Sequence, residues 1–414
     1  MRMKFNKSSQ LLLVSVASLL VSGLVTACST LTVDFVFVAS SKAAGTNSYG
    51  EMDVFEVNSE SGRMRQIPTS PFPSGGRNPV AEAVSSDNED LFVVNQDDNT
   101  IVQFVIGNDG KLYPYNTINT PGIFPLAVAV NGTNLFVVDL YQPLPICSPA
   151  EPCSGSISVI PITAATSTAP DKLNPPVSNG NLAYWPLSLA SKPGDIIVPT
   201  AVNVATTGPS SAPLTYAYVT AYDSSVTPNV GYVFGFGVSS GGVLSPVNGG
   251  VPVAAGVFPS AAASQSSPSA SYLYVTDFTT GKIFGYSVGS TGTLSALGGS
   301  PFQTGNQPTS VVVDPVYPYL YVANSLDSTV QAYSINSGTL KSLGTYSTGL
   351  DPVAIGIDPS TNHFLYTANS LGNTVSGFQL SATDGSLLNS QSSPYSSNAQ
   401  PTAVAAIPHG TPAK

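Results

Sequence analysis

The sequence predicts an all-β protein, a seven-bladed β-propeller made of four-stranded blades. The main observation is a phrase that occurs seven times: a proline, a run of small and branched apolar residues, a turn, and a second apolar run. Successive copies lie 44 to 74 residues apart, and most of these intervals match the 40–50 residues typical of a propeller blade. The seven prolines are Pro79, Pro125, Pro199, Pro259, Pro308, Pro352 and Pro401.

The copy at Pro308 shows the four predicted strands most clearly. Thr309–Val313 is a Val-rich innermost strand, and Tyr319–Ala323 is an aromatic and β-branched second strand. Thr329–Ile335 alternates as a half-buried third strand should, and Gly338 marks the outer turn before a weaker fourth strand. The other second strands are predicted at Phe35–Ala39, Leu91–Asn95, Leu135–Asp139, Tyr216–Thr220, Tyr272–Thr276 and Phe364–Ala368.

The two ends of the repeat predict how the ring closes. The second strand at Phe35 has no innermost strand before it, and the innermost strand at Thr402 has no second strand after it. We therefore expect both ends to share one blade with the C-terminal strand innermost. Such closure pairs a sheet edge that a linear array would leave exposed. The propeller is expected to span 35–408, followed by a tail at 409–414.

The first 27 residues are predicted to be a signal peptide rather than part of the fold. Three basic residues precede a short apolar run, Leu11–Leu20, which is too short to span a bilayer. The segment Leu24–Cys28 resembles the lipobox of bacterial lipoproteins, which implies lipidation of Cys28, a tether at 28–34 and an outer-membrane location. Cleavage of an unlipidated signal peptide at the same small residues is the alternative.

Composition limits the partners that the chain can have. Only 9% of the residues are charged while 42% are hydrophobic, which suits an exported, folded β protein rather than a disordered chain. Without residues 1–27 the net charge is −13, since 23 acidic residues face 10 basic ones. This charge disfavours nucleic acid as a partner. The expected partners are the membrane, through the lipid anchor, and a glycan, small-molecule or protein ligand.

Cys147 and Cys153 remain as a pair once Cys28 is assigned to lipidation. In an oxidising compartment we expect them to form a disulfide that closes a small loop. A metal site is the weaker reading, because no His or Asp lies near them in the sequence. They fall in the first of two insertions, 142–155 and 164–196, which enlarge the third blade. The second insertion contains the sole tryptophan, Trp185, and is either a blade-edge cover or a lid.

The default ligand site of a propeller is the mouth of its central channel. We define the mouth as the face formed by the entry loops, which precede the innermost strands, and the return loops, which follow the second strands. Asn and Asp there either cap turns through their own backbone or bind a sugar or cation such as Ca²⁺, although no cofactor is expected. The rim candidates are Asn78, Asn95, Asp97, Asp139, Asp277, Asn306, Gln307, Asn324, Asp351 and Asn369.

Glu82 is the only charged residue in the seven predicted innermost strands. A carboxylate there is expected to be paired, with Arg77 of the preceding entry loop as the candidate partner, or to have a raised pKa. The structural reading is an ion pair beside an axial water channel. The functional reading is a catalytic acid or ligand anchor, with Arg77 as its companion. His363 and His409, the only histidines, are not placed to act as a general base.

Several phrases resemble those of known propellers. Tyr319–Asn324, Phe364–Asn369 and Leu91–Asn95 resemble the Tyr-Val-Thr-Asn repeat of bacterial surface propellers. With the Gly-x-Leu outer turns and Ser300–Phe302, the chain is also similar to the lactonase family, which includes 6-phosphogluconolactonases and a fungal muconate-cyclising enzyme. The resemblance covers about 33–408. It implies His, Arg and acidic residues at the mouth, of which only Arg77, Glu82 and the Asp residues can be placed.

Two functions follow from this reading. The first is a non-catalytic envelope propeller that binds a glycan, peptide or protein, which the missing histidine and sparse bases favour. The alternative is a lactonase acting on an unphosphorylated sugar lactone or similar ester, with Glu82 or a rim aspartate activating water. A phosphorylated substrate would need a basic pocket, and the predicted mouth has one arginine.

Overall fold

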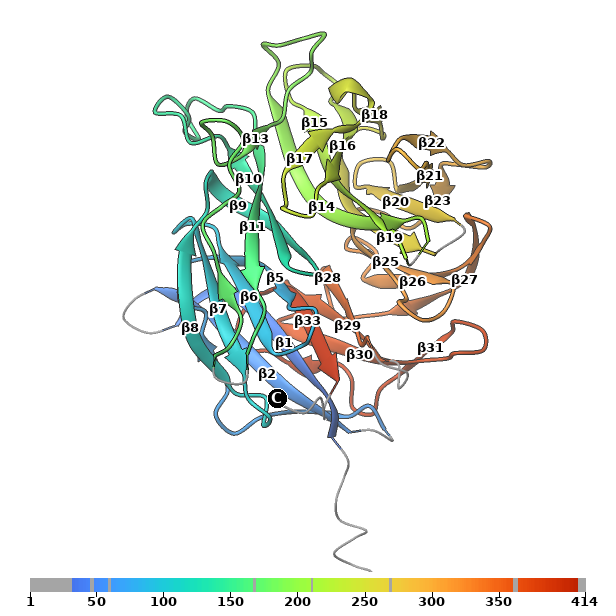
Figure 1. Cartoon of the computed structure of the whole chain (residues 1–414). Coiled ribbons are helices and arrows are strands. Elements are labelled where there is room, and N and C mark those ends of the chain that lie inside the picture. The colour runs from blue at the N-terminus through green and yellow to red at the C-terminus, as the bar shows by residue number, and fades with distance from the viewer. Residues whose placement is uncertain are drawn as a thin grey trace, which may run out of the picture.

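The computed structural model describes residues 32–44, 48–58, 61–166, 169–209, 211–267, 270–359 and 364–408. Seven antiparallel sheets stand around a common axis (Figure 1), which confirms the predicted seven-bladed β-propeller. The innermost strands contact one another in a closed cycle, β33–β5–β9–β14–β19–β24–β28 and back to β33. No helix in the described part of the chain is long and apolar enough to cross a bilayer.

The strand bounds agree with the predicted repeat. The innermost strands are β5 (Pro79–Val84), β9 (Ile123–Asn131), β14 (Ile197–Thr207), β19 (Pro259–Ser266), β24 (Pro308–Val313), β28 (Pro352–Ile357) and β33 (Pro401–Pro408). The second strands are β1 (Thr32–Ala44), β6 (Asp90–Asn95), β10 (Asn134–Tyr141), β15 (Leu214–Asp223), β20 (Ser271–Asp277), β25 (Tyr319–Asn324) and β29 (Phe364–Asn369).

The outer half of each blade consists of a third strand and a fourth strand, and in five blades the fourth strand has only two or three residues. The third strands are β2 (Tyr49–Asn58), β7 (Thr100–Ile106), β11 (Ser156–Thr163), β16 (Val230–Val238), β21 (Lys282–Val288), β26 (Thr329–Asn336) and β30 (Thr374–Leu380). The fourth strands are β3 (Met64–Gln66), β8 (Leu112–Asn119), β12 (Lys172–Leu173), β17 (Leu244–Pro246), β22 (Leu294–Ala296), β27 (Thr339–Ser347) and β31 (Leu387–Asn389). Short segments β4 (Phe72–Pro73), β13 (Trp185–Pro186), β18 (Val253–Ala254), β23 (Phe302–Gln303) and β32 (Tyr395–Ser396) also pair with third strands, and a 3-10 turn, η1, spans Val247–Gly250.

Ring closure occurs in the blade that contains β1, as the ends of the repeat predict. The C-terminal strand β33 pairs antiparallel with β1, from Asp34 opposite Pro408 to Ser40 opposite Pro401, and forms the innermost strand of that sheet. Figure 1 shows β33 in red directly beside β1 in blue. We number this closing blade as blade 1 and the blades of β5, β9, β14, β19, β24 and β28 as blades 2 to 7.

The repeated aromatics and glycines contact each other between blades. The first aromatic of a second strand packs against the outer-turn glycine of the next blade, as Tyr216 does against Gly292. Gly292 has a φ of +77°, and a Cβ there would lie 2.3 Å from the Tyr216 ring, so no other residue fits. Two residues later, Tyr218 donates a hydrogen bond of 2.7 Å to the carbonyl of Gly292. Blades 5 and 6 make the same bond, from Tyr274 to Gly338 and from Tyr321 to Gly385.

At the closing seam this pattern changes. The equivalent tyrosine of blade 7, Tyr366, donates its hydrogen bond to the carboxylate of Asp34, at 2.8 Å, instead of to a glycine carbonyl. Burial, and then the charge of the neighbouring Asp358, raise the pKa of Asp34 to about 8. The seam therefore contains a buried carboxylic acid where blades 4, 5 and 6 have a neutral backbone acceptor.

The insertions of the third blade cover its edge. Trp185 lies in β13, which pairs with β11, and only 5% of its surface is exposed because it packs in the core between blades 3 and 4. The structure thus favours the edge-cover reading of this insertion over a lid. In the other insertion Cys147 and Cys153 are joined by the predicted disulfide.

Candidate functional site

Most of the predicted rim residues at the ends of second strands are buried. Asn95, Asp139, Asp277, Asn324 and Asn369 each have no exposed surface. Each lies against a glycine of the entry loop in its own blade, where a Cβ would clash with the Asn or Asp side chain. Asp277, for example, accepts hydrogen bonds from the backbone N–H groups of Val257 and Phe258. Asn95, Asp139, Asp277 and Asn324 hydrogen-bond the entry loops of their blades, and Asn369 bonds Thr374 and Ser376 of β30, so all five are engaged in holding the fold.

Blade 2 presents a different set of side chains at the mouth. Arg77, half exposed in the entry loop, forms an ion pair of 2.6 Å with Asp98 of the return loop. Its Nη2 also donates to the backbone carbonyl of Asp97, at 3.2 Å. Asn78 donates from Nδ2 to the carboxylate of Asp97, at 3.1 Å, and so orients an acid that is exposed to solvent. We call Arg77, Asn78, Asp97 and Asp98 the blade 2 cluster.

The electrostatics of the cluster follow from the Arg77–Asp98 pair. Partial burial disfavours the charged form of Asp98, but hydrogen bonds from the Arg77 side chain and backbone prevail and lower the pKa of Asp98 below its ordinary value. Asp98 therefore stays ionised and fixes the guanidinium in place. Nη1 of Arg77 makes no hydrogen bond to any residue that the structure describes, so it is available to a ligand at the mouth.

Comparison with blade 6 shows which residues and hydrogen bonds of the blade 2 cluster also occur in another blade. There Asn306 occupies the place of Arg77, and its backbone N–H and Nδ2 bind Asp327, which corresponds to Asp98, at 2.7 and 2.9 Å. The loop bond to this aspartate is thus shared by blades 2 and 6, which alone have an aspartate at this position. The positions of Arg77 and Asp97 hold Asn306 and Leu326 in blade 6, and Leu350 and Leu371 in blade 7. An arginine and an adjacent exposed aspartate occur at these positions only in blade 2.

A left-handed backbone at the residue before the repeat proline is also a property of the repeat. Asn78, Phe124, Gln307 and Asp351 all have φ between 52° and 59°. Because four different side chains share it, this strain does not mark a site by itself.

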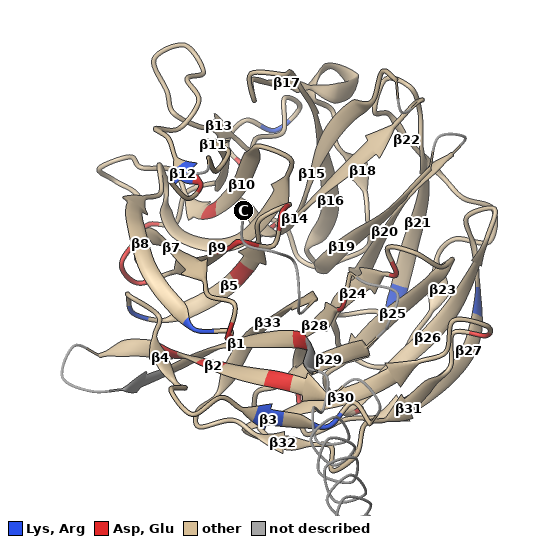
Figure 2. Ribbon diagram, turned by 60° about the horizontal axis from the view of Figure 1, so that its bottom comes forward, with Lys and Arg blue, Asp and Glu red and all other residues tan. Residues whose placement is uncertain are grey.

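Glu82 lies in the same blade but is not paired with Arg77, so of the two alternatives that the sequence left open, the ion pair is not formed and the raised pKa is found. The reason is that Asp98 already binds the guanidinium, whereas Glu82 faces blade 1 beside β33. Both carboxyl oxygens are buried and have no hydrogen bond of regular geometry to a described residue. Burial raises the pKa of Glu82 well above its ordinary value, against a smaller opposing effect of the Ala405 backbone. In Figure 2 acidic segments (red) are scattered among ribbons that are mostly uncharged (tan), and β5 carries one of them.

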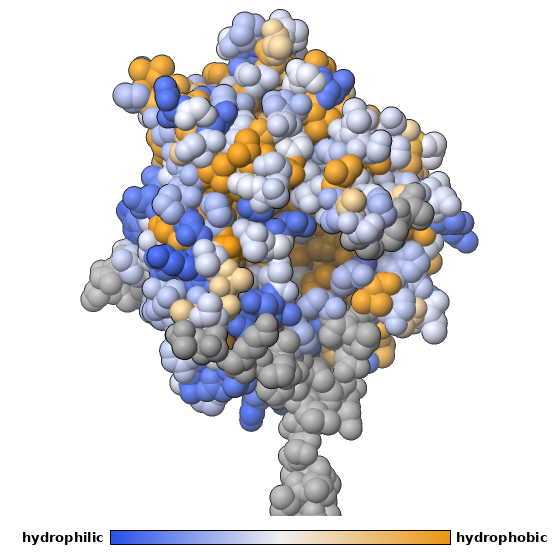
Figure 3. All heavy atoms as spheres, viewed as in Figure 1, coloured by the Kyte–Doolittle hydropathy of each residue, from blue (hydrophilic) through white to orange (hydrophobic). Residues whose placement is uncertain are grey.

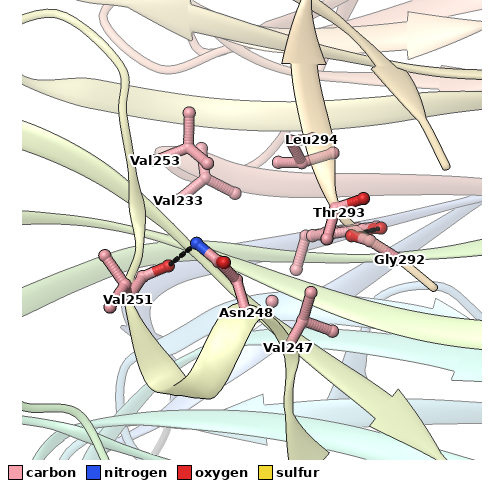
Figure 4. A pocket seen from close by; sticks show the side chains of 10 residues that line it. Val233, Val247, Asn248, Val251, Val253, Gly292, Thr293 and Leu294 are labelled. Atoms are coloured by element: carbon pink, nitrogen blue, oxygen red, sulfur yellow. Dashed lines mark hydrogen bonds between the residues drawn. The ribbon is translucent and has the colours of Figure 1, made fainter.

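The space-filling view shows a hollow in the middle of the ring with apolar atoms in its depth (Figure 3). A smaller cavity of about 150 Å³ lies away from the mouth, between blades 4 and 5 (Figure 4). Its lining is mainly aliphatic, with Asn248 bonded to its own loop at Val251. It carries no titratable group that could do chemistry on a polar substrate apart from the engaged hydroxyl of Tyr218.

Other predicted elements lie outside the described residues, namely Cys28, His363 and His409. Among the residues that the structure does describe, no three His, Cys, Asp or Glu side chains come together in a group that could hold a metal ion. The sequence reasoning missed Asp98, although its blade 6 counterpart Asp327 stands at the same distance from the repeat proline. It also did not single out Phe124 and Phe258, which directly precede two of the repeat prolines.

Comparisons with known proteins agree with this architecture. The model of the lactonase family, described as a 7-bladed β-propeller, matches residues 260–410, which confirms the sequence resemblance over that part of the chain. No curated protein matches the chain by sequence.

Two solved structures show the same fold. One is a periplasmic gluconolactonase from Pseudomonas aeruginosa, with a TM-score of 0.66 and 16% identity over 92% of this chain and 100% of that one. Another is a putative 6-phosphogluconolactonase from Bacteroides fragilis, with a TM-score of 0.63 and 17% identity over 92% and 99%. At such identities the likeness concerns the fold alone.

Proposed function

We propose that this protein is a lactonase that hydrolyses an unphosphorylated sugar lactone or a similar ester at the mouth of its channel. The observation that carries the proposal is that Arg77 and Asp97 depart from the repeat in the same blade and lie side by side. In blades 6 and 7 these two positions hold uncharged residues, so the fold does not need an acid and a guanidinium there. The matched lactonase family and the solved gluconolactonase propeller support the choice of reaction.

The cluster contains the groups that lactone hydrolysis requires. Water must lose a proton as it attacks the carbonyl carbon, and the ring oxygen must gain one as its bond to that carbon breaks. Asp97, oriented by Asn78, would accept the proton from water and return it to the ring oxygen. Arg77, fixed by Asp98, would direct its free Nη1 at the carbonyl oxygen, where negative charge develops.

The proposed substrate is unphosphorylated for an electrostatic reason. The one guanidinium of the cluster is already paired with Asp98, and Asp97 lies next to it. A phosphate dianion would meet a site with at least as many acids as bases. A neutral lactone ring has no such penalty.

Repeat-guided exchanges test the proposal without disturbing the fold. Arg77→Asn and Asp97→Leu give blade 2 the residues that blade 6 already uses at these positions, so the loops should remain fastened. Each change should lower kcat/KM for D-glucono-1,5-lactone about 100-fold, measured by pH-stat titration of the released acid, with an unchanged melting temperature. Asp109→Asn, which removes an exposed acid from an outer turn, is the matched control.

The envelope location is also a proposal. It rests on the lipobox-like segment ending at Cys28, and a periplasmic lactonase of the same fold is known in Pseudomonas aeruginosa.

Non-catalytic ligand binding is the second candidate function. The observation that favours it is the burial of both carboxyl oxygens of Glu82, which keeps the only acid of the inner strands away from any substrate in the channel. Absence of hydrolysis across a panel of sugar and aliphatic lactones, by protein that binds a glycan, would establish this candidate and remove the first.

A further inference from the structure

Five aromatic side chains gather at the mouth on the side of blades 3 to 5, next to the blade 2 cluster. Phe124 and Tyr141 of blade 3 meet edge to face, with ring centroids 6.1 Å apart. Tyr222 of blade 4 lies 4.6 Å from Phe258 of blade 5, and Phe258 lies 5.8 Å from Phe278. All five stand in entry or return loops or at the mouth ends of strands. We call them the aromatic arc.

The two halves of the arc stand on neighbouring blades, with Phe124 and Tyr141 on blade 3 and Tyr222 on blade 4. Burial, and then the charge of Tyr141, raise the pKa of Tyr222. Phe124, Tyr222, Phe258 and Phe278 are only half-buried, so their rings are partly open to the mouth, while Tyr141 is buried beneath them.

The arc is also joined to the proposed reaction site. Asn99, two residues beyond Asp97 in the same return loop, accepts a hydrogen bond of 2.6 Å from the backbone N–H of Phe124. Phe124 is thereby held in its left-handed conformation at the first position of the arc. A ligand that reaches from Asp97 along the mouth therefore meets Phe124 first.

The charges around the arc indicate what kind of ligand fits. Lys192, the cation near Asp223 at the end of β15, lies 3.4 Å from Asp195 and 3.6 Å from Asp223, so its charge is already balanced. Among the side chains that the structure describes, the other cations of the mouth are Arg77, which is paired with Asp98, and Lys282, which begins β21 opposite Asp277. The surroundings of the arc therefore carry no excess of positive charge that would select an anion, and they offer hydrogen-bond acceptors and donors to hydroxyl groups.

We propose that the aromatic arc binds the rings of a neutral saccharide, so that the substrate is a lactone carrying at least one further sugar ring. A β-linked glucose ring presents C–H groups on both faces and hydroxyls at its edge, which suits stacking on an open aromatic face within a polar rim. The proposal that the protein binds a saccharide rests on the aromatic arc alone. The identity of the substrate as an extended sugar lactone rests on the proposed lactonase function.

The first experiment measures binding alone. Cellotriose, which contains no lactone, is titrated by calorimetry into the wild-type protein and into Tyr222→Leu and Phe258→Leu, which keep apolar volume but remove the flat ring. We expect each variant to weaken binding about three- to tenfold. Tyr113→Leu and Tyr115→Leu, at exposed aromatics of β8 on the outer edge of blade 2, should bind as the wild type does. No binding by the wild-type protein, or equal affinity in the arc variants, would overturn the proposal.

The second experiment separates this proposal from the lactonase function. Hydrolysis of cellobionolactone is compared with that of D-glucono-1,5-lactone, and the arc variants should raise KM for the disaccharide lactone only, with kcat unchanged. If the wild type hydrolyses neither lactone but binds cellotriose through the arc, the lactonase function fails and the saccharide site stands. If both lactones are hydrolysed and the arc variants change neither KM, the saccharide site fails and the lactonase stands.

Discussion

At the scale of single residues, departures from the repeat are more informative than the repeat itself. The seven blades act as internal controls for one another: a side chain shared by several blades has a role in the fold that can be seen in each of them. Arg77 and Glu82 have no charged counterparts at the equivalent positions of other blades, and Asp97 has no exposed acidic counterpart, since Asp223 of blade 4 is buried. Arg77, Asp97 and Glu82 all belong to blade 2. The geometry then divides them, because Arg77 and Asp97 are accessible and adjacent while Glu82 is shut between blades 1 and 2.

Glu82→Gln should stabilise the protein in a pH-dependent way. The pKa of Glu82 is raised in the folded state, so the folded protein keeps a proton that the unfolded chain releases above about pH 4.5. Protonated Glu82 therefore contributes fully to the free energy of unfolding below that pH, and this contribution declines as the pH rises toward the folded-state pKa. Glutamine keeps the neutral shape at every pH.

The measurement is the melting temperature of both proteins from pH 4 to pH 9. The curves should coincide near pH 4, and the variant should melt higher above pH 6, with lactone hydrolysis retained. Loss of hydrolysis with an unchanged melting curve would instead return Glu82 to the catalytic role that the sequence suggested.

At the scale of the element, the blade is held to its neighbour by an aromatic ring, a glycine and a tyrosine hydroxyl. These features occur in separate parts of the sequence phrase, and their contact is visible only once consecutive blades are stacked. Tyr216 lies more than 70 residues before Gly292, yet the two are in van der Waals contact, and Tyr218 bonds the same glycine.

Gly292→Ala should therefore destabilise the protein by about 2–4 kcal/mol, because alanine is strained at positive φ and its methyl group would overlap the Tyr216 ring. Gly298→Ala, also in blade 5 but with open space around the position and no positive φ, should change stability by less than about 0.5 kcal/mol. Chemical denaturation of the two variants beside the wild type is the measurement. Equal effects at both positions would show that the contact with Tyr216 does not hold the blades together.

The sequence predicts the elements well because their periodicity is local. All seven innermost and second strands, the outer turns and the closing strand can be located from proline spacing and alternation alone. The site is predicted less completely because it depends on which loops meet. The Arg77–Asp98 pair joins residues that are 21 apart in the sequence. Asn78 and Asn95 look alike in the sequence, but only Asn95 is buried, because it lies under its entry loop. The rim amides and acids are buried because the loops pack over them, and this packing cannot be read from the sequence alone.

At the scale of the whole molecule, the ring depends on β33. Removing residues 400–414 deletes the innermost strand of blade 1 and leaves the inner edge of β1 without a partner, while blades 2 and 7 lose the strand that they both contact. We expect the truncated protein to aggregate or to melt without a single cooperative transition, followed by circular dichroism and light scattering. A control lacking only 410–414 should melt as the full chain does. Cooperative melting of the longer deletion would contradict the closure.

Attachment to the membrane through Cys28 is a second prediction at this scale. Cys28→Ala, or treatment of cells with an inhibitor of the lipoprotein signal peptidase, should alter processing of the precursor and move the protein from the membrane to the soluble fraction. Fractionation followed by immunoblotting measures this, with Cys147→Ala, which touches only the small disulfide loop, as the control. Membrane association that persists in Cys28→Ala would exclude lipidation at this residue.

The pairing of β1 with β33 also decides how the protein would be presented to its surroundings. Asp34, near the start of β1, stands opposite Pro408, at the end of β33. Innermost strands run away from the mouth, so both ends of the described propeller leave from the opposite face. An attachment point upstream of Thr32 would therefore hold the ring by its back, with the blade 2 cluster and the aromatic arc directed outward to diffusing saccharides. The pairing of β1 with β33 thus determines which face of the propeller points away from the attachment point, whatever that attachment is.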